Sequence, residues 1–150
     1  MREKSGGRRA ACPVARAIDA VGDGWSLLIV RDAFDGVSRF GDFVASLGIA
    51  SNILTARLRA LETAGVLEAV PAADGSTFRD YVLTPAGREL FPIVLALRQW
   101  GEAHLFAPGE KRSELVERGS GKPVPRQAVR GSNGRTLKSE DTEVRKVPRA

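Results

Sequence analysis

The sequence RFGDFVASLGIASNILTARLRALETAGVL, residues 39–67, holds the strongest fold signal in the chain. In its first part, apolar residues recur at three- and four-residue spacing, which predicts a short amphipathic helix. These residues are Phe40, Phe43, Val44 and Leu47. Gly48 follows them, and glycine tolerates the positive φ of a tight helix exit. Ser51 is a favoured N-cap residue, so we expect a second helix to begin at this point.

The expected second helix, at about residues 50–64, has an apolar side and a polar side. Its apolar side consists of Leu54, Leu58 and Leu61. Its polar side consists of small or hydrogen-bonding residues, namely Asn52, Thr55, Ala56, Arg59 and Thr63. Two short helices joined by so tight a turn predict a helix-turn-helix whose second helix is free to enter a groove of DNA.

The polar side has the chemistry that base recognition requires. Asn52 can pair bidentately with adenine and Arg59 with guanine. Thr55 or Ser51 can meet a phosphate or a thymine methyl group, and the small Ala56 permits close approach. An ordinary helical hairpin with a solvated polar side is the alternative interpretation, and these residues alone leave both open.

The segment after the helix-turn-helix predicts a β-hairpin. Residues 67–70 and 78–83 have the composition of strands, and Asp74-Gly75 between them is a strong turn signal. We expect this hairpin to form a wing, from which Arg79 either reaches a phosphate or pairs with Asp80 or Glu68. Thr84-Pro85 then starts a helix, and Pro92 predicts a break near residues 90–91.

Helices are also expected on both sides of this region. Cys12-Pro13 opens a first helix, residues 25–34 form an apolar and therefore buried helix, and Ser38 is expected to cap the helix that follows it. The terminal helix has a wide apolar stripe that contains Trp100, and a second copy of the chain can cover it. The alternative is that the stripe packs on the first helix of its own chain. The dimer-interface candidates are Val14, Ile18, Val94, Leu97, Trp100 and His104.

Composition divides the chain of 150 residues into three parts: a flexible basic N-terminus (1–11), one domain (12–106) and a flexible basic tail (107–150). The formal net charge is +5, yet residues 13–106 hold eight arginines against eleven carboxylates. The excess positive charge therefore lies in the two ends. Overall charge is weak evidence for nucleic-acid binding in this chain.

Several classes of protein are not expected. The chain has no run of eighteen apolar residues and no apolar segment behind its basic start, so neither a membrane span nor a secretory signal is expected. Cys12 is the only cysteine, which is compatible with the cytoplasm and excludes an internal disulfide. Cys12 and His104 lack further metal ligands, and no phosphate-binding loop or nucleophile–base pair is evident. We therefore expect no metal, no cofactor and no enzymatic activity.

Three stretches together resemble a known family. Residues 12–70, the sequence FRDYVLTPAGREL at 78–90, and Trp100-Gly101 are similar to the HxlR-type winged helix-turn-helix regulators, relatives of the MarR-like repressors. The resemblance implies a mainly α-helical fold with a small β-hairpin wing, and helical dimerisation elements at both ends of the domain. It also implies a bacterial DNA-binding transcriptional regulator, mainly a homodimeric repressor.

The resemblance assigns roles to particular positions. The second helix of the helix-turn-helix would read the major groove of an operator, and the wing would touch the flanking backbone or minor groove. The DNA-binding candidates are Arg39, Ser51, Asn52, Thr55, Ala56, Arg57, Arg59 and Arg79, of which Arg57 borders the apolar side. Many family members have a cysteine at the position of Cys12, and in some it senses oxidants or electrophiles; a small-molecule effector is the other option. A winged-helix protein-interaction module without DNA binding is the alternative function.

Overall fold

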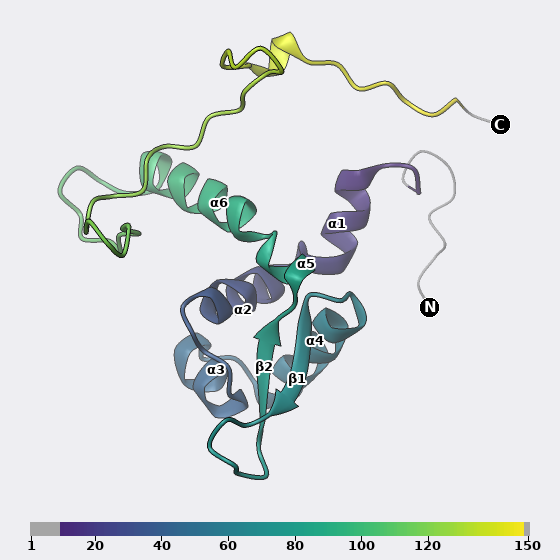
Figure 1. The fold of residues 1–150 in the computed structure, drawn as a ribbon, viewed down its shortest axis with the longest axis vertical. Coiled ribbons are helices and arrows are strands. Elements are labelled where there is room, and N and C mark those ends of the chain that lie inside the picture. The colour runs from purple at the N-terminus through teal and green to yellow at the C-terminus, as the bar shows by residue number, and fades with distance from the viewer. Residues whose placement is uncertain (1–9, 149–150) are drawn as a thin grey trace. The chain divides into compact units, whose positions relative to one another are not determined.

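The computed structural model of the chain describes residues 10–148. The flexible N-terminus predicted for residues 1–11 lies almost entirely outside them. Two compact units are present: residues 10–91 with 147–148, and Pro92–Lys146. Figure 1 shows their elements. These are α1 (Pro13–Val21), α2 (Gly24–Phe34), α3 (Phe40–Leu47), α4 (Ser51–Thr63), β1 (Leu67–Pro71), β2 (Arg79–Leu83), α5 (Pro85–Arg88), α6 (Phe91–His104) and the 3₁₀ helix η2 (Ser139–Asp141).

The core of the first unit is built from the apolar sides of α2, α3, α4 and the start of β1. Its most completely buried side chains include Ile29, Val30, Phe43, Leu54, Leu58, Leu61 and Leu67. The prediction that α4 turns its leucines inward is therefore confirmed. Of the apolar helix predicted at 25–34, Ile29 and Val30 are buried, while Leu28 is 37% exposed. Removing such side chains from water is the main stabilising contribution to the fold.

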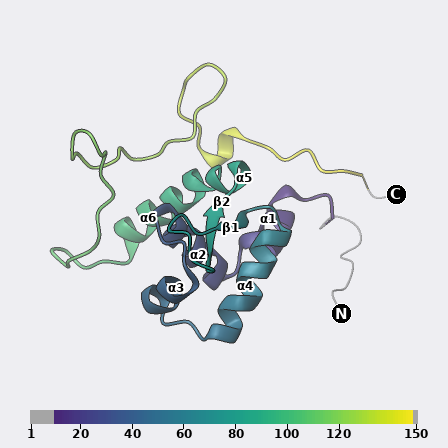
Figure 2. The same cartoon turned by 60° about the horizontal axis from the view of Figure 1, so that its bottom comes forward.

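The turn between α3 and α4 has the geometry expected of a helix-turn-helix, and it lies at the bottom of Figure 2. Gly48 adopts a φ of 62° and its N–H donates to the carbonyl of Val44 at 2.9 Å, which ends α3. Ile49 is then buried, and Ala50 adopts the extended conformation of an N-cap. The predicted helix-turn-helix is thus present.

Two predicted helix caps were wrong. The N-cap of α4 is Ala50, which makes no side-chain cap bond, and Ser51 is already helical. Because Ile49 is buried next to the turn, α4 begins one residue earlier than the N-cap preference of serine suggested. The N-cap of α3 is Arg39, because Ser38 belongs to the edge of the wing, where its carbonyl accepts from the N–H of Tyr81 at 2.8 Å.

The wing is the antiparallel ribbon of β1 and β2 with the loop of residues 72–78, and this loop projects at the bottom of Figure 1. Leu67 pairs with Leu83 at its base and Pro71 with Arg79 near its tip. Each strand differs from its predicted range by one residue. Gly75 in the loop has a φ of 74°, as the Asp74-Gly75 turn signal suggested.

The chain leaves the wing through a tight contact beside β1. Thr84 is the N-cap of α5: its hydroxyl oxygen accepts from the N–H of Gly87 at 3.0 Å. Gly87 is buried, and a Cβ atom on it would lie 2.1 Å from the carbonyl oxygen of Val66. The interruption between α5 and α6 confirms the break predicted near Pro92.

The second unit consists of most of α6 and the segment that follows it. Leu95 is buried on one side of α6, where Glu102 pairs with Arg112 at 2.7 Å and Gln99 hydrogen-bonds residues 125 and 127. Residues 107–127 therefore share a unit with α6, although the sequence suggested a boundary at residue 106. The flexibility expected for residues 107–150 stays a prediction. Within residues 10–148, no helix has the length and apolar character needed to span a bilayer.

Candidate nucleic-acid interface

The outward side of α4 is open to solvent. Asn52, Ala56, Arg59 and Thr63 are exposed, as is Ser51 at the start of the helix. Within residues 10–148, no ion pair or side-chain hydrogen bond engages Asn52 or Arg59. Their donors and acceptors are therefore available to an external partner, and the helix that presents them is anchored by three buried leucines.

Two features of this side of α4 refine the sequence analysis. Thr55 is half-buried and its hydroxyl donates to the carbonyl of Ser51 at 2.9 Å, so this donor is already used within the helix. Ile53, which the sequence analysis did not single out, is 37% exposed beside the polar side. It adds an apolar edge that is suited to a thymine methyl group. The only signal for Ile53 in the sequence is its position on the helix, at the border between the leucine side and the polar side.

Arg57 lies on the flank of α4 and faces the start of α2. Its Nε atom is 3.4 Å from Oδ1 of Asp23, and the same oxygen accepts from the N–H of Ser26 as the N-cap of α2. Burial opposes ionisation of Asp23, but hydrogen bonding to Ser26 and the charge of Arg57 outweigh it and lower the pKa of this carboxyl. Arg57 therefore ties α4 to α2, which separates it from the outward-facing Arg59.

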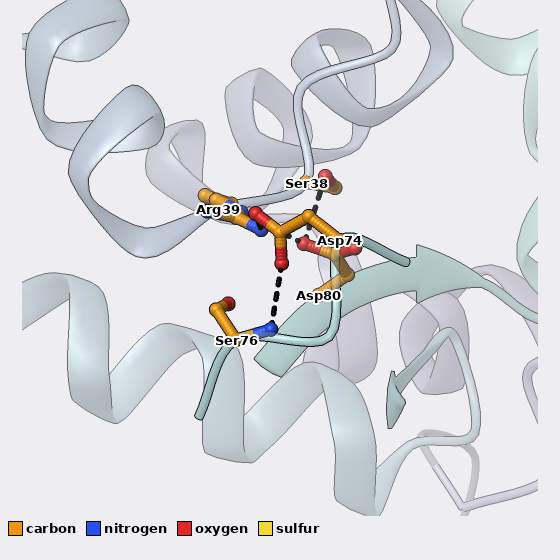
Figure 3. A network of polar contacts seen from close by, with 5 residues as sticks. All are labelled: Ser38, Arg39, Asp74, Ser76 and Asp80. Atoms are coloured by element: carbon orange, nitrogen blue, oxygen red, sulfur yellow. Dashed lines mark hydrogen bonds and ion pairs between the residues drawn. The ribbon is translucent and has the colours of Figure 1, made fainter. Parts of the chain in front are cut away.

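Arg39 also has partners within its own chain, and these are in the wing (Figure 3). Its Nη2 atom lies 2.5 Å from Oδ2 of Asp74, and its Nε atom lies 3.3 Å from Oδ1 of Asp80. Ser38 donates to the same Asp80 oxygen at 3.4 Å. The guanidinium carbon of Arg39 is 5.8 Å from the centroid of the Phe78 ring, a cation–π contact.

Charge in this cluster is compensated. Hydrogen bonds from Ser76, and then the guanidinium of Arg39, lower the pKa of the Asp74 carboxyl to about 2. The hydrogen bond from Arg39 to Asp74 in turn raises the pKa of Arg39. Both groups are therefore charged throughout the neutral range. The charge of Arg39, unlike that of Arg59, is therefore already neutralised by carboxylates of the same chain.

Arg79 is exposed at the start of β2 and, within the described residues, makes neither of the ion pairs considered for it. Asp80 is engaged by Arg39 and Ser38 instead. An open groove of about 590 Å³ lies between the start of α3 and the wing. Its lining includes Arg39, Asp42, Thr77, Phe78, Arg79 and Tyr81. Arg79 is thus the positively charged residue of the wing that has no ion pair within the described residues.

Cys12 is the half-buried N-cap of α1, and its Sγ atom accepts from the N–H of Ala15 at 3.4 Å. Arg16, four residues further along α1, donates from Nε to the carbonyl of Ala10 at 2.7 Å. On α1, Val14 and Ile18 are 66% and 55% exposed, so much of the apolar stripe of this helix is uncovered.

The outer side of α6 is also apolar and exposed. Leu97 and Trp100 are 51% and 58% exposed, His104 is exposed with its ring 5.1 Å from that of Trp100, and Val94 is half-buried. Ile93, which extends this stripe by one turn, was not among the sequence candidates and is 45% exposed. Over the part of the chain that the structure describes, no three His, Cys, Asp or Glu side chains are grouped to hold a metal ion.

Comparisons with known proteins agree with this geometry. The family model for HxlR-like helix-turn-helix proteins matches residues 20–108. The uncharacterized HTH-type transcriptional regulator Rv3095 of Mycobacterium tuberculosis strain ATCC 25618 / H37Rv is 44% identical over 95 residues, which is 63% of this chain and 60% of that protein. The match therefore spans less than two thirds of this relative.

Two solved structures extend the likeness. The crystal structure of PA1607, named as a candidate transcription factor, has a TM-score of 0.87 at 58% identity and covers 92% of this chain and 96% of that one. The redox regulator HypR in its reduced form has a TM-score of 0.58 at 33% identity and covers 63% of this chain and 94% of that one. The likeness to PA1607 reaches beyond the residues that the family model matches.

Proposed function

The chain belongs to the HxlR-like helix-turn-helix family, and we propose that it is a homodimeric transcriptional regulator, mainly a repressor, which reads operator DNA with α4. The observation that supports this most directly is the two-sided character of α4: three leucines are buried, while Asn52 and Arg59 are exposed and have no partner among residues 10–148. The similar proteins are named as transcriptional regulators, not as enzymes.

In this proposal α4 lies in the major groove. Arg59 donates two hydrogen bonds to O6 and N7 of a guanine, and Asn52 pairs with an adenine. Ala56 between them lets the helix approach the base edges closely, and Ile53 and the methyl group of Thr55 supply apolar contacts. Ser51, at the start of α4, binds a phosphate.

The electrostatics of the first unit make the attraction to DNA selective rather than strong. Three of its arginines, Arg31, Arg39 and Arg57, are paired with carboxylates of the chain itself. Of the arginines on α4 and the wing, Arg59 and Arg79 remain for DNA, together with the basic residues beyond position 106. Because each neutralised phosphate adds about 0.9 to the slope of affinity against salt on logarithmic axes, the first unit alone should show a shallow slope.

The test measures binding to an operator duplex recovered by capturing the genomic DNA that the full-length protein binds. Affinity is measured by fluorescence anisotropy at about 50 and about 200 mM salt, where phosphate-mediated binding must fall. Arg59→Ala should lose about 1–3 kcal/mol at its own base pair. If Arg59→Ala keeps wild-type affinity and base preference, the groove assignment is wrong. If no duplex is bound at either salt concentration, the protein-interaction module becomes the better function.

Dimerisation in this proposal uses the exposed stripes of α1 and α6. Each stripe is apolar and uncovered in the single chain, and a two-fold axis places two α4 helices against half-sites about 34 Å apart. Trp100→Ala and Leu97→Glu should both shift the protein toward monomer in light-scattering measurements. A mass of one chain for the wild-type protein at micromolar concentration would contradict this part of the proposal.

Regulation by a thiol at Cys12 is the third part of the proposal. HypR, one of the similar structures, is named as a redox regulator, and Cys12 is the only cysteine of this chain. Oxidation would therefore join it to Cys12 of a second subunit or to a small thiol. Cys12→Ser should bind the operator as the wild type does but ignore diamide. Equal responses of the two proteins to diamide would exclude Cys12 as the sensor.

A further inference from the structure

The wing cannot hold its own position. A two-stranded ribbon is only marginally stable in water, and strands of five residues offer few contacts of their own. The loop of residues 72–78 is largely exposed; Ala72 is its buried residue, and Phe78 at its end is 67% exposed. Apart from two backbone hydrogen bonds within the loop, the tip therefore depends on contacts from outside the ribbon.

Two carboxylates of the wing are fixed by the residues just before α3. Asp80, in β2, accepts from Ser38 and Arg39, and its side chain is only 16% exposed. Asp74, at the tip, uses one oxygen to accept from the N–H of Ser76 at 2.9 Å and the other to bind Arg39 at 2.5 Å. One guanidinium thus joins the tip and the stem of the wing to the start of the helix-turn-helix (Figure 3).

We propose that Asp74 and Asp80 are positioning residues that act through Arg39: they hold the wing tip against the start of α3 and so set where Arg79 meets the DNA beside the α4 site. This wing latch consists of Arg39, Asp74 and Asp80. It rests on the proposed DNA binding, because its purpose is the placement of a wing contact.

The exposure of the latch supports a local role rather than a stabilising one. The side chains of Arg39 and Asp74 are 33% and 53% exposed, and ion pairs this open to water add little to global stability. They can nevertheless restrict an exposed loop, which opens at little cost without them. The cation–π contact with the Phe78 ring further restricts the positions that the Arg39 guanidinium can adopt.

Charge supplies a second reason for the latch. The outer part of the wing, residues 71–80, has two carboxylates, Asp74 and Asp80, against one arginine, Arg79, so alone it would be repelled by phosphate. The guanidinium of Arg39 cancels the excess. The latch therefore lets an acidic loop approach DNA while it leaves Arg79 unpaired.

The first test uses the free, full-length protein and follows amide hydrogen exchange in residues 72–78. Asp74→Ser keeps a side-chain oxygen that can accept from the N–H of Ser76, but it removes the negative charge. It is preferred to Asp74→Asn, which would place an Asn-Gly pair in the turn. Asp74→Ser and Arg39→Gln should each raise exchange by about fivefold or more. The double variant should not exceed Arg39→Gln by much, because both changes break the contact between Arg39 and Asp74. Unchanged exchange in both single variants would overturn the proposal.

The second test uses the operator duplex in two lengths: with about one helical turn of flanking DNA at each end, and trimmed to the α4 sites. Arg39→Gln and Asp74→Ser should lose about fivefold affinity for the long duplex and less than about twofold for the trimmed one. Asp42→Asn, which removes an exposed charge from the first turn of α3 outside the latch, is the matched control. Asp74→Ser could instead bind the long duplex more tightly than Asp42→Asn does. That result would show that Arg39, once free of Asp74, contacts a phosphate itself, and it would overturn the positioning role.

The two tests separate this inference from the proposed function. Failure of the wild-type protein to bind either duplex would reject DNA binding, while exchange in the free protein would still decide whether the latch holds the loop. A uniform loss of affinity for both duplexes would indicate a general structural role and would also overturn the inference.

Discussion

The outward side of α4 and the wing differ in whether their arginines are paired with carboxylates of the same chain. On α4, Arg59 stands on a helix held from behind by buried leucines and has no partner among the described residues. Beside the wing, Arg39 is bound by two carboxylates and makes a cation–π contact with the Phe78 ring. Arg59 is thus left without a partner where buried leucines anchor its helix, whereas Arg39 is paired where the neighbouring loop buries few side chains.

The largest expected effect tests whether packing really anchors α4 and not the wing. Leu58→Ala should lower the free energy of unfolding by about 2–5 kcal/mol, because Leu58 is 2% exposed and the lost side chain leaves a cavity. Phe78→Ala in the wing should change it by less than about 0.5 kcal/mol, since that ring is mostly exposed. Urea denaturation of both variants measures the difference, and equal effects would erase the contrast.

The next effect concerns the root of the wing. Gly87→Ala should destabilise the protein by about 1–3 kcal/mol, because the new Cβ would overlap the carbonyl oxygen of Val66 just before β1. Gly41→Ala is the control: it lies in α3 with open space around it and should be neutral or stabilising by up to about 1 kcal/mol. Thermal unfolding reports both, and a stable Gly87→Ala protein would show that α5 can move away from β1.

A smaller effect distinguishes the two arginines of α4. Arg57→Ala should lower stability by at most about 1 kcal/mol, because its pair with Asp23 is half exposed, and it should leave base preference unchanged. Arg59→Ala, in contrast, should change base preference and leave stability nearly as it was. Competition binding with single-base operator variants, run beside denaturation, separates the two. A change of base preference in Arg57→Ala would return that residue to the interface.

The smallest expected effect is the pH dependence of the wing. Because the pKa of Asp74 is lowered to about 2, its pair with Arg39 is present above the ordinary aspartate pKa near 4 and is lost only as the pH falls through about 2. Carboxyl chemical shifts of Asp74, followed by NMR between pH 2 and 7, should show no transition above about pH 4. A transition near the ordinary aspartate value would mean that the latch is open in solution.

Local patterns in the sequence predicted the elements that depend on neighbouring residues. The leucine spacing of α4, the turn at Gly48, the hairpin at Asp74-Gly75 and the break at Pro92 were each read from a few adjacent positions. The cap predicted at Ser51 was wrong, because the N-cap of α4 is Ala50. The preference of serine for an N-cap is weaker than the burial of Ile49, and burial depends on the whole core.

The sequence by itself determined that the chain forms a helix-turn-helix with a wing, because the period of apolar residues and the conformations open to glycine and proline are local properties. Only the tertiary structure decided which arginines remain for a partner. Arg39 meets Asp74 across 35 residues of sequence, and Arg57 meets Asp23 across a similar distance. Charge pairs of this kind form where packing brings distant segments together, so a list of arginines cannot reveal which of them are already satisfied.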